Sequence, residues 1–241
     1  MEYINFGIDL GTTNSGICVF QDGKVNVLKN PVGFRETLPS VVAFMKNRTL
    51  VGDKANELLL SVPGQVFSSF KRKMGTDERY KLPFTEESTN PVELSALVLR
   101  ELTNFHQSEI KAAVVTIPAS FDTIQSNATK EASLKSGFEH VSLLQEPIAA
   151  CLAYANTNNL DIETNKNWLV YDFGGGTFDA AIVTINKREL KVKDHEGNNF
   201  LGGLDIDLGI IKKVLVPKIE NSTDLLDLQE KLNSEKIEYQ K

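Results

Sequence analysis

Two segments of the sequence place aspartate, glycine and threonine in the same order. Residues 7–13 read GIDLGTT, and residues 170–177 read VYDFGGGT. In both, an apolar run leads to the aspartate and a second apolar run follows the threonine, which is typical of two strands joined by a turn. The repeat indicates that one structural device occurs twice, once in each half of the chain.

These residue types suit the binding of a phosphate group and a magnesium ion. Glycine lets backbone N–H groups approach a ligand closely, because it has no Cβ atom and tolerates positive φ. Successive N–H groups in such a turn form an anion site, and threonine hydroxyls add donors. An aspartate at the end of a strand can hold Mg²⁺, usually through water. Two facing turns would therefore hold a triphosphate between two halves of the molecule.

An ordinary tight turn is the alternative interpretation of each segment, because Asp, Gly and Thr favour turns by themselves. The presence of two copies, and of three consecutive glycines at 174–176, favours a backbone role in binding. Neither segment matches GxxxxGK[ST], and no GxGxxG opens a helix, so the turns are not those of a P-loop or a dinucleotide site.

The composition gives little support to other chemistries. The cysteines and histidines are unclustered, which argues against a zinc site or a Ser/His/Asp triad; they are Cys18, Cys151, His106, His140 and His195. The formal charge is -6 with scattered Lys and Arg, which argues against nucleic acid. No apolar run approaches the ~18 residues of a membrane span, and the N-terminus lacks a signal peptide pattern. We expect a cytoplasmic protein with neither nucleic acid nor a membrane as partner.

The elements that must position the two turns follow from apolar periodicity and capping signals. Strands are expected at 3–9, 15–21, 25–29, 40–44, 113–117, 141–144, 168–171, 178–185 and 189–194. Helices are expected from 53 to before 63, over 91–105, from 123 to 137, from 147 and over 205–218, with a charged helical stretch at the C-terminus. The alternation of strand and helix after residue 112 predicts a parallel sheet covered by helices.

The polar stretch 156–166 is the clearest internal boundary, because it is weakly patterned and precedes a new strand. We expect a first lobe at 1–166, with its core at 1–38 and 88–166 and a small peripheral subdomain at about 39–87. Residues 167–241 would begin a second lobe.

A series of motifs resembles those of the seventy-kilodalton heat-shock (DnaK-type) chaperones. In chain order they are DLGTTNS (9–15), FKR (70–72) with MG (74–75), IPA (117–119), EP (146–147) with AA (149–150), DFGGGTFD (172–179) and LGG (201–203). The match covers nearly the whole chain. The short interval between Lys71 and Pro118, with PVELS at 91–95, is similar to the bacterial HscC branch, whose first peripheral subdomain is small.

The resemblance implies an α/β, actin-like (ribonuclease H-like) ATPase fold with two lobes around a cleft, the first lobe complete and the second partial. It implies ATP or ADP with Mg²⁺ as cofactors and hydrolysis of ATP to ADP and phosphate. Catalytic roles would fall to Lys71, Glu146, Asp172 and Thr177. Asp9, Asp172 and Asp179 would hold the metal. The nucleotide would contact Gly11, Thr12, Thr13, Asn14, Gly174, Gly175, Gly176, Thr177, Gly202 and Gly203.

Two of these residues have simpler interpretations. Lys71 also fits a solvated basic patch with its neighbours Arg72 and Lys73. Glu146 before Pro147 also fits an acid favoured by the helix dipole at a helix start.

The resemblance also implies partners in a longer protein: client polypeptides, a J-domain co-chaperone and, as a further candidate, a nucleotide-exchange factor. We expect the chain to be the N-terminal portion of such a protein, ending before the second lobe is complete. The alternatives are a kinase or a filament-forming ATPase of the actin-like superfamily, or an inactive fragment.

Overall fold

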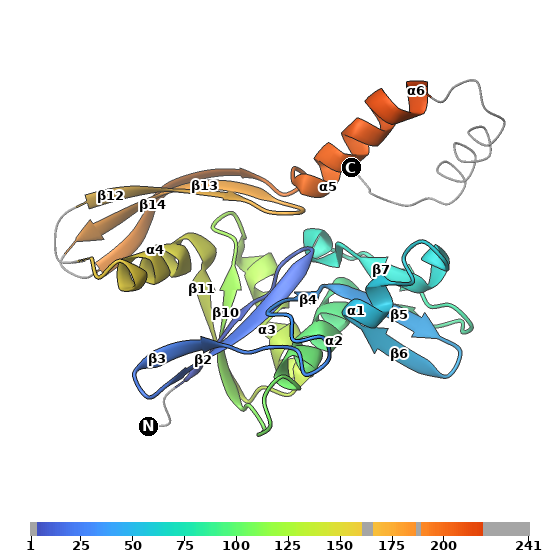
Figure 1. Ribbon diagram of the computed structural model, residues 1–241, viewed down its shortest axis with the longest axis horizontal. Helices are drawn as coiled ribbons and strands as arrows, with labels where there is room; N and C mark the ends of the chain where they lie inside the picture. The colour runs from blue at the N-terminus through green and yellow to red at the C-terminus, as the bar shows by residue number, and fades with distance from the viewer. Residues whose placement is uncertain (1–3, 161–165, 187–188, 219–241) are drawn as a thin grey trace.

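A mixed sheet forms the centre of the computed structural model, which describes residues 4–160, 166–186 and 189–218 (Figure 1). Its strand order is β11-β10-β1-β2-β3, with β4 paired to β2. β1 runs parallel to β10 and antiparallel to β2, and β10 runs parallel to β11. The strands are β1 (Phe6–Asp9), β2 (Asn14–Gln21), β3 (Lys24–Val27), β4 (Leu38–Pro39), β10 (Ala112–Ile117) and β11 (His140–Gln145).

Two capped helices pack against this sheet and against each other, α2 (Pro91–Thr103) and α3 (Thr123–Ser136). The side chain of Asn90 accepts a hydrogen bond from Glu93 N at the start of α2. Asp122 and Gln125 form a capping box at the start of α3, which ends at Gly137 with φ +119°. The predictions of these two helices are confirmed.

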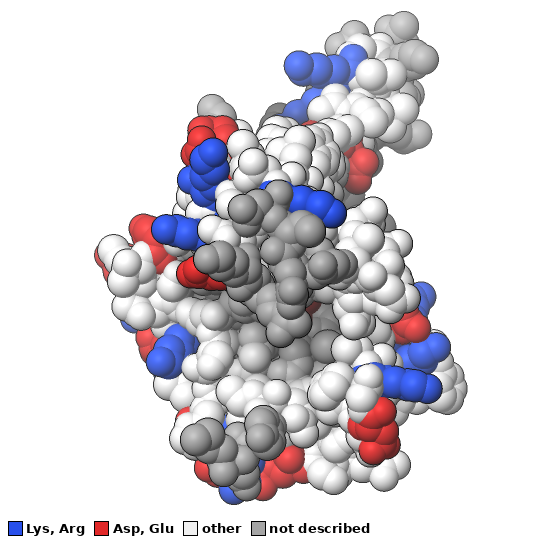
Figure 2. Space-filling view, turned by 90° about the vertical axis from the view of Figure 1, so that its left-hand side faces the viewer, with Lys and Arg blue, Asp and Glu red and all other residues white. Residues whose placement is uncertain are grey.

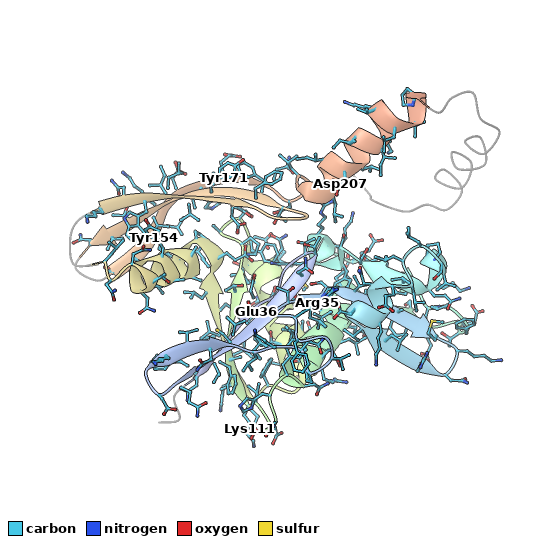
Figure 3. The ribbon with its side chains drawn as sticks, viewed as in Figure 1. Arg35, Glu36, Lys111, Tyr154, Tyr171 and Asp207 are labelled. Carbon is cyan, nitrogen blue, oxygen red and sulfur yellow. The ribbon has the colours of Figure 1, made fainter. Side chains whose placement is uncertain are left out.

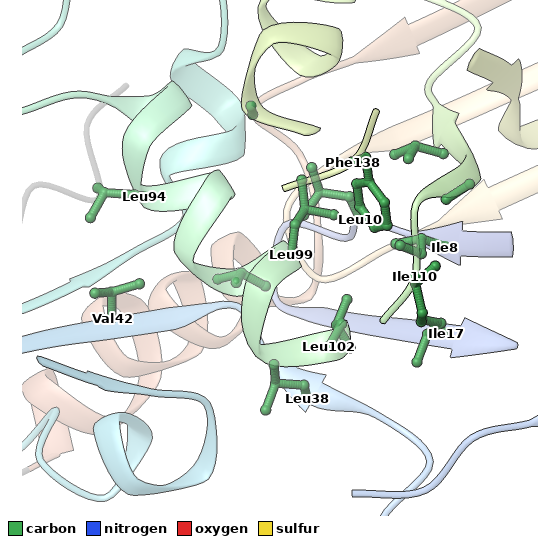
Figure 4. Close-up of a cluster of buried hydrophobic side chains, with 14 of the residues drawn as sticks. Ile8, Leu10, Ile17, Leu38, Val42, Leu94, Leu99, Leu102, Ile110 and Phe138 are labelled. Carbon is green, nitrogen blue, oxygen red and sulfur yellow. The ribbon is translucent and has the colours of Figure 1, made fainter. Parts of the chain in front are cut away.

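The main core lies between the sheet and α2. It contains Ile8 and Leu10 from β1 and the adjoining turn, and three leucines of α2 that are fully buried. Figure 4 shows this cluster with Leu94, Leu99 and Leu102 labelled. Burying leucine contributes about 1.5–3 kcal/mol per side chain, so this layer fixes the place of β1 and of the turn that follows it.

Residues 41–89 form two small sheets beside the main one. Their order is β6-β5-β7 and β8-β9, with bounds Val41–Met45 (β5), Arg48–Val51 (β6), Val66–Ser68 (β7), Tyr80–Lys81 (β8) and Ser88–Thr89 (β9). The helix expected from 53 to before 63 is wrong in length, since α1 (Asp53–Asn56) is one turn long. Tighter turns continue the chain, with Leu58 N bonded to Ala55 O, because Leu58 and Leu59 pack onto Val41 and Ala43.

A second sheet lies over helix α4 (Glu146–Thr157), in the order β12-β13-β14 (Figure 1). The strands are β12 (Lys166–Phe173), β13 (Phe178–Asn186) and β14 (Glu189–Asn198). Trp168 and Val183 pack on α4, and Trp168 meets Tyr154 of α4 edge to face at 5.6 Å. Leu169 and Tyr171 are 72% and 68% exposed on the other face, where Figure 3 shows Tyr171 turned away from α4. The alternation of strand residues therefore sets which face α4 covers.

The last described helix begins earlier than expected. α5 (Gly203–Ile210) starts two residues before the predicted 205 and continues through a π-turn (Ile211–Leu215) into α6 (Val216–Lys218). The predicted stretch beyond 218, and residue 3 of the first predicted strand, lie outside the described residues. The predicted strands are confirmed, and each observed end lies within four residues of the predicted one. The division of the chain into lobes stays a prediction.

Charges of both signs are interspersed on the face that Figure 2 shows, as the scattered Lys and Arg residues suggested. Across the described ranges, no helix is both long and apolar enough to cross a membrane.

Candidate functional site

The two repeated segments form the same local structure in two different sheets. β1 and β2 pair antiparallel around the first turn, residues 10–13, with Asp9 opposite Gly16. β12 and β13 pair in the same way around the second turn, residues 174–177, with Asp172 opposite Asp179. Asp9 is the last residue of β1 and Asp172 is the last but one of β12, so the predicted strand-turn-strand device is confirmed in both copies.

The two turns touch each other. A Cβ atom on Gly175 would lie 3.0 Å from Cβ of Thr13, and closer still to the ends of that side chain. A Cβ on Gly176 would lie 2.9 Å from Cβ of Thr12. Since real Cβ atoms avoid such separations, the glycines are required for the close approach of the second turn to the first.

A cavity of about 430 Å³ opens between the turns. Most of the predicted site residues line it: Asp9, Gly11, Thr12, Thr13, Asn14, Lys71, Glu146, Asp172, Gly174, Gly175, Gly176 and Thr177. Its volume is within the range of small-molecule sites. A second cavity, of about 500 Å³ beside β14, contains none of the predicted residues. The tertiary structure thus collects residues from four separate stretches of sequence at one place.

Lys71 and Glu146 form a buried ion pair in the wall of this cavity. Nζ of Lys71 donates to Oε1 of Glu146 at 2.9 Å, and the two side chains are 5% and 16% exposed. Lys71 is carried by a 3-10 helix, η2 (Phe70–Lys73), that follows the left-handed residue Ser69. The alternative of a solvated basic patch is therefore wrong for Lys71. Glu146 is the first residue of α4 and also binds Lys71. An acid at a helix start and a residue of the site are therefore compatible interpretations of it.

Carboxylates outnumber cations around the cavity. Burial raises the pKa of Glu146, Lys71 opposes this shift, and the charges of Asp9 and Asp172 add to it. Burial and the charge of Asp9 likewise raise the pKa of Asp172. The cavity lining thus carries three carboxylates and one ammonium group, and a bound cation would offset the excess negative charge.

The donor set fits magnesium rather than a metal held by protein ligands alone. Asp9 and Asp172 both face the cavity, and the hydroxyl of Thr116 fixes Asp9 by donating to its Oδ1 at 2.8 Å. Over the described part of the chain, no three His, Cys, Asp or Glu side chains are grouped closely enough to hold a metal by themselves. Mg²⁺ commonly takes one or two carboxylates and completes its shell with water and phosphate oxygens.

Asp179 is not among the residues that line the cavity. It is 4% exposed, and burial raises its pKa while a hydrogen bond from Ser120 opposes that shift. Its Oδ1 has no hydrogen-bond partner among the residues that the structure describes. Asp179 is the cross-strand partner of Asp172 on β13, and its predicted role as a metal ligand stays a prediction.

Gly202 and Gly203 also lie outside the cavity lining, against the back of the second turn. Gly203 N donates to Gly174 O at 3.0 Å. A Cβ on Gly202 would lie 2.6 Å from Gly175 O and closer to Gly176 N. In this structure the two glycines face the backbone of the turn, and their direct contact with nucleotide stays a prediction.

Sequence reasoning missed two contributors to the site. Thr116, at the end of β10, holds Asp9. Arg72 forms a two-bond ion pair with Asp205 of α5, next to the second turn. The adjacency of Arg72 to Lys71 was the one available signal, and nothing in the sequence identifies Asp205 as its partner.

A family model and similar curated proteins point to the same family. A family model described as "Hsp70 protein" matches residues 5–238. A protein of Thermotoga petrophila named "Chaperone protein DnaK" is 45% identical over 212 residues, which are 85% of this chain and 34% of that protein. The protein of the same name from Thermosipho melanesiensis is 44% identical over 217 residues, 87% of this chain and 35% of that protein. The chain spans about a third of the length of these curated relatives.

Proposed function

The chain belongs to the Hsp70 family, and we propose that it is the N-terminal, ATP-binding and ATP-hydrolysing part of a DnaK-type molecular chaperone. The mixed α/β sheets are consistent with the actin-like (ribonuclease H-like) ATPase fold. One observation carries the proposal: two aspartate-glycine-threonine turns from different sheets meet around a cavity that also contains the Lys71–Glu146 pair.

The phosphates would lie between the two turns. Backbone N–H groups and hydroxyls of Thr12 and Thr13 would donate to them from one side, and residues 174–177 would do so from the other. Asn14, which also lines the cavity, would add a polar contact. Asp9 and Asp172 would hold Mg²⁺ through water, and the ion would neutralise phosphate charge when bound. Asp179, the cross-strand partner of Asp172, would support the metal shell beside it.

Hydrolysis would depend on the buried pair. Lys71 would reach the terminal phosphate and stabilise the charge that develops there, because its ammonium group is held in the cavity wall. Glu146 would orient Lys71 and the attacking water, and Asp172 and Thr177 would complete the arrangement. Phosphoryl transfer requires mainly positioning and charge neutralisation, which is what this site offers.

Gly202 and Gly203 would contact the nucleotide, as the resemblance implies, and they would have a second role. They would support the second turn from behind, since Gly203 N bonds to Gly174 O and Gly202 packs on Gly175. The two lobes, with boundaries at about 166 and a peripheral subdomain at about 39–87, also stay part of the proposal.

The partners and the cellular compartment are proposed from membership of the family alone. In a longer protein the partners would be client polypeptides, a J-domain co-chaperone and a nucleotide-exchange factor, in the cytoplasm. The short interval between Lys71 and Pro118 supports a place near the HscC branch.

Titration of the 241-residue chain with Mg-ATP and Mg-ADP, with single-turnover hydrolysis, tests the proposal. Wild type should bind both nucleotides and hydrolyse ATP, and Lys71→Ala should lose about 10²–10³ in rate while retaining ADP binding. Lys73→Ala, in the same 3-10 helix but outside the cavity lining, is the matched control. If the folded chain binds neither nucleotide, the proposal is wrong for this chain. Phosphate transfer to a sugar would favour the kinase alternative.

A further inference from the structure

The short helix η2 places two consecutive cations in two different buried environments. Lys71 enters the cavity and binds Glu146, whereas Arg72 is absent from the cavity lining and reaches α5. The Arg72 side chain is 5% exposed, as buried as that of Lys71. Arginine is almost never this deeply buried unless its charge is paired, so the partner of Arg72 is part of what holds it in place.

The partner of Arg72 is Asp205, which is distant in sequence and 28% exposed. Nη1 of Arg72 donates to Oδ1 of Asp205 at 3.2 Å, and Nη2 donates to Oδ2. Two parallel bonds between a guanidinium and a carboxylate fix orientation as well as distance. The pair therefore ties η2, beside the first sheet, to the first turn of α5, beside the second sheet.

The first turn of α5 is itself bonded to the second glycine turn. Gly203 N donates to Gly174 O at 3.0 Å, and Leu204 N donates to Gly175 O at 2.9 Å. Asp205 follows these residues directly. The two residues before Asp205 are thus bonded to the backbone of Gly174 and Gly175.

Arg72 also contacts the second turn directly. A Cβ on Gly176 would lie 3.0 Å from Nε of Arg72 and 2.9 Å from Cβ of Thr12, which belongs to the first turn. Nε is buried and has no hydrogen-bond partner within the described residues, so packing against the turn holds this end of the guanidinium. Gly176 is enclosed between Thr12 and Arg72.

We propose that Arg72 is a positioning residue which, through Asp205 and the start of α5, holds residues 174–177 against residues 10–13 and so sets the geometry of the phosphate site. This inference rests on the proposed function for its kinetic consequences. The structural part, that the Arg72–Asp205 pair orders the second turn, can be tested without any enzymatic activity.

Hydrogen exchange of the nucleotide-free 241-residue chain tests the structural part. Arg72→Met and Asp205→Asn should each accelerate exchange in the segment 174–177 by about tenfold, because the turn opens more often. The double variant should exchange no faster than the faster single variant, since both changes break one interaction. Arg79→Met and Asp207→Asn, exposed residues on the same two stretches of chain, should leave this segment unchanged. Unchanged exchange in Asp205→Asn, or full additivity in the double variant, would overturn the proposal.

Kinetics distinguish positioning from a contribution to stability alone. Asp205→Asn should lower the single-turnover rate constant, measured with the site saturated with Mg-ATP, about tenfold. Arg72→Lys, which keeps the charge but loses the two-bond geometry, should fall between wild type and Arg72→Met. A lower melting temperature with an unchanged rate constant in the folded protein would contradict the positioning role. If wild type does not hydrolyse ATP, the proposed function fails and the exchange experiment alone decides on the pair.

Discussion

Thr13 and Gly175 touch across the candidate site although they belong to different sheets. Cβ of Thr13 lies 3.0 Å from the position that a Cβ on Gly175 would occupy. This contact brings the first turn, after β1, against the second turn, after β12. The two turns can therefore approach this closely only because residue 175 has no side chain.

Replacing Gly175 by alanine should separate the turns. Inserting a methyl group into a packed contact costs about 1–3 kcal/mol, and the strain falls on the nucleotide site. We expect the affinity for Mg-ADP to fall by about tenfold or more, measured by isothermal titration. Gly209→Ala is the control, because a Cβ there meets nothing within 4 Å and alanine favours the helix. Equal affinities of Gly175→Ala and wild type would show that Thr13 can move aside.

The two adjacent glycines behind the second turn should respond differently to the same change. Gly202→Ala directs a Cβ at the backbone of Gly175 and Gly176, which cannot rotate away as a side chain can. We expect it to lower the free energy of unfolding by about 1–3 kcal/mol in chemical denaturation. Gly203→Ala places its Cβ at ordinary contact distance, 3.8 Å from Gly175 Cα, and should be close to neutral. The prediction fails if both variants are equally stable.

The carboxylates at the strand ends should control the effect of magnesium. Asp172→Asn removes one charge that faces the cavity. The factor by which Mg²⁺ increases the affinity for ADP should therefore be about tenfold smaller than in wild type. Asp9→Asn should behave in the same direction. Asp207→Asn, an exposed residue of α5 labelled in Figure 3, should retain the full magnesium effect. Titrations with and without Mg²⁺ measure this, and an unchanged effect in both site variants would exclude these residues as metal ligands.

The stability of Lys71→Ala should depend on pH. The pKa of Glu146 is raised in the folded protein, so its protonation favours folding; this contribution is present below its ordinary pKa and is lost as pH rises through the folded value. Removing Lys71 raises this pKa further, because the ammonium group no longer stabilises the carboxylate.

Lys71→Ala should accordingly be less stable than wild type by about 3 kcal/mol at ~pH 8, and by clearly less at ~pH 5. Denaturation of both proteins across this range measures the difference. Lys73→Ala serves as the control and should show no such pH dependence. A constant difference between wild type and Lys71→Ala would mean that Glu146 does not titrate in this range.

Local patterns were sufficient to predict most elements of the fold. Asn90 before Pro91, and Gly137 after α3, mark helix ends by local hydrogen bonds and backbone angles. The Asp22-Gly23 turn between β2 and β3 has φ of +53° and +74°, as its residue types require. Residues 53–62 were mispredicted, because a short leucine-rich segment takes its shape from the sheet it packs on.

The sequence by itself determined the two turns and the residues that could bind phosphate and magnesium, since glycine, threonine and aspartate act there through their own backbone and side-chain chemistry. Only the tertiary structure decided that Gly202 and Gly203 pack against the backbone of the second turn, and that Arg72 meets Asp205. Such contacts depend on how two sheets pack, and that packing sums many small apolar contacts across the whole chain that no local pattern records.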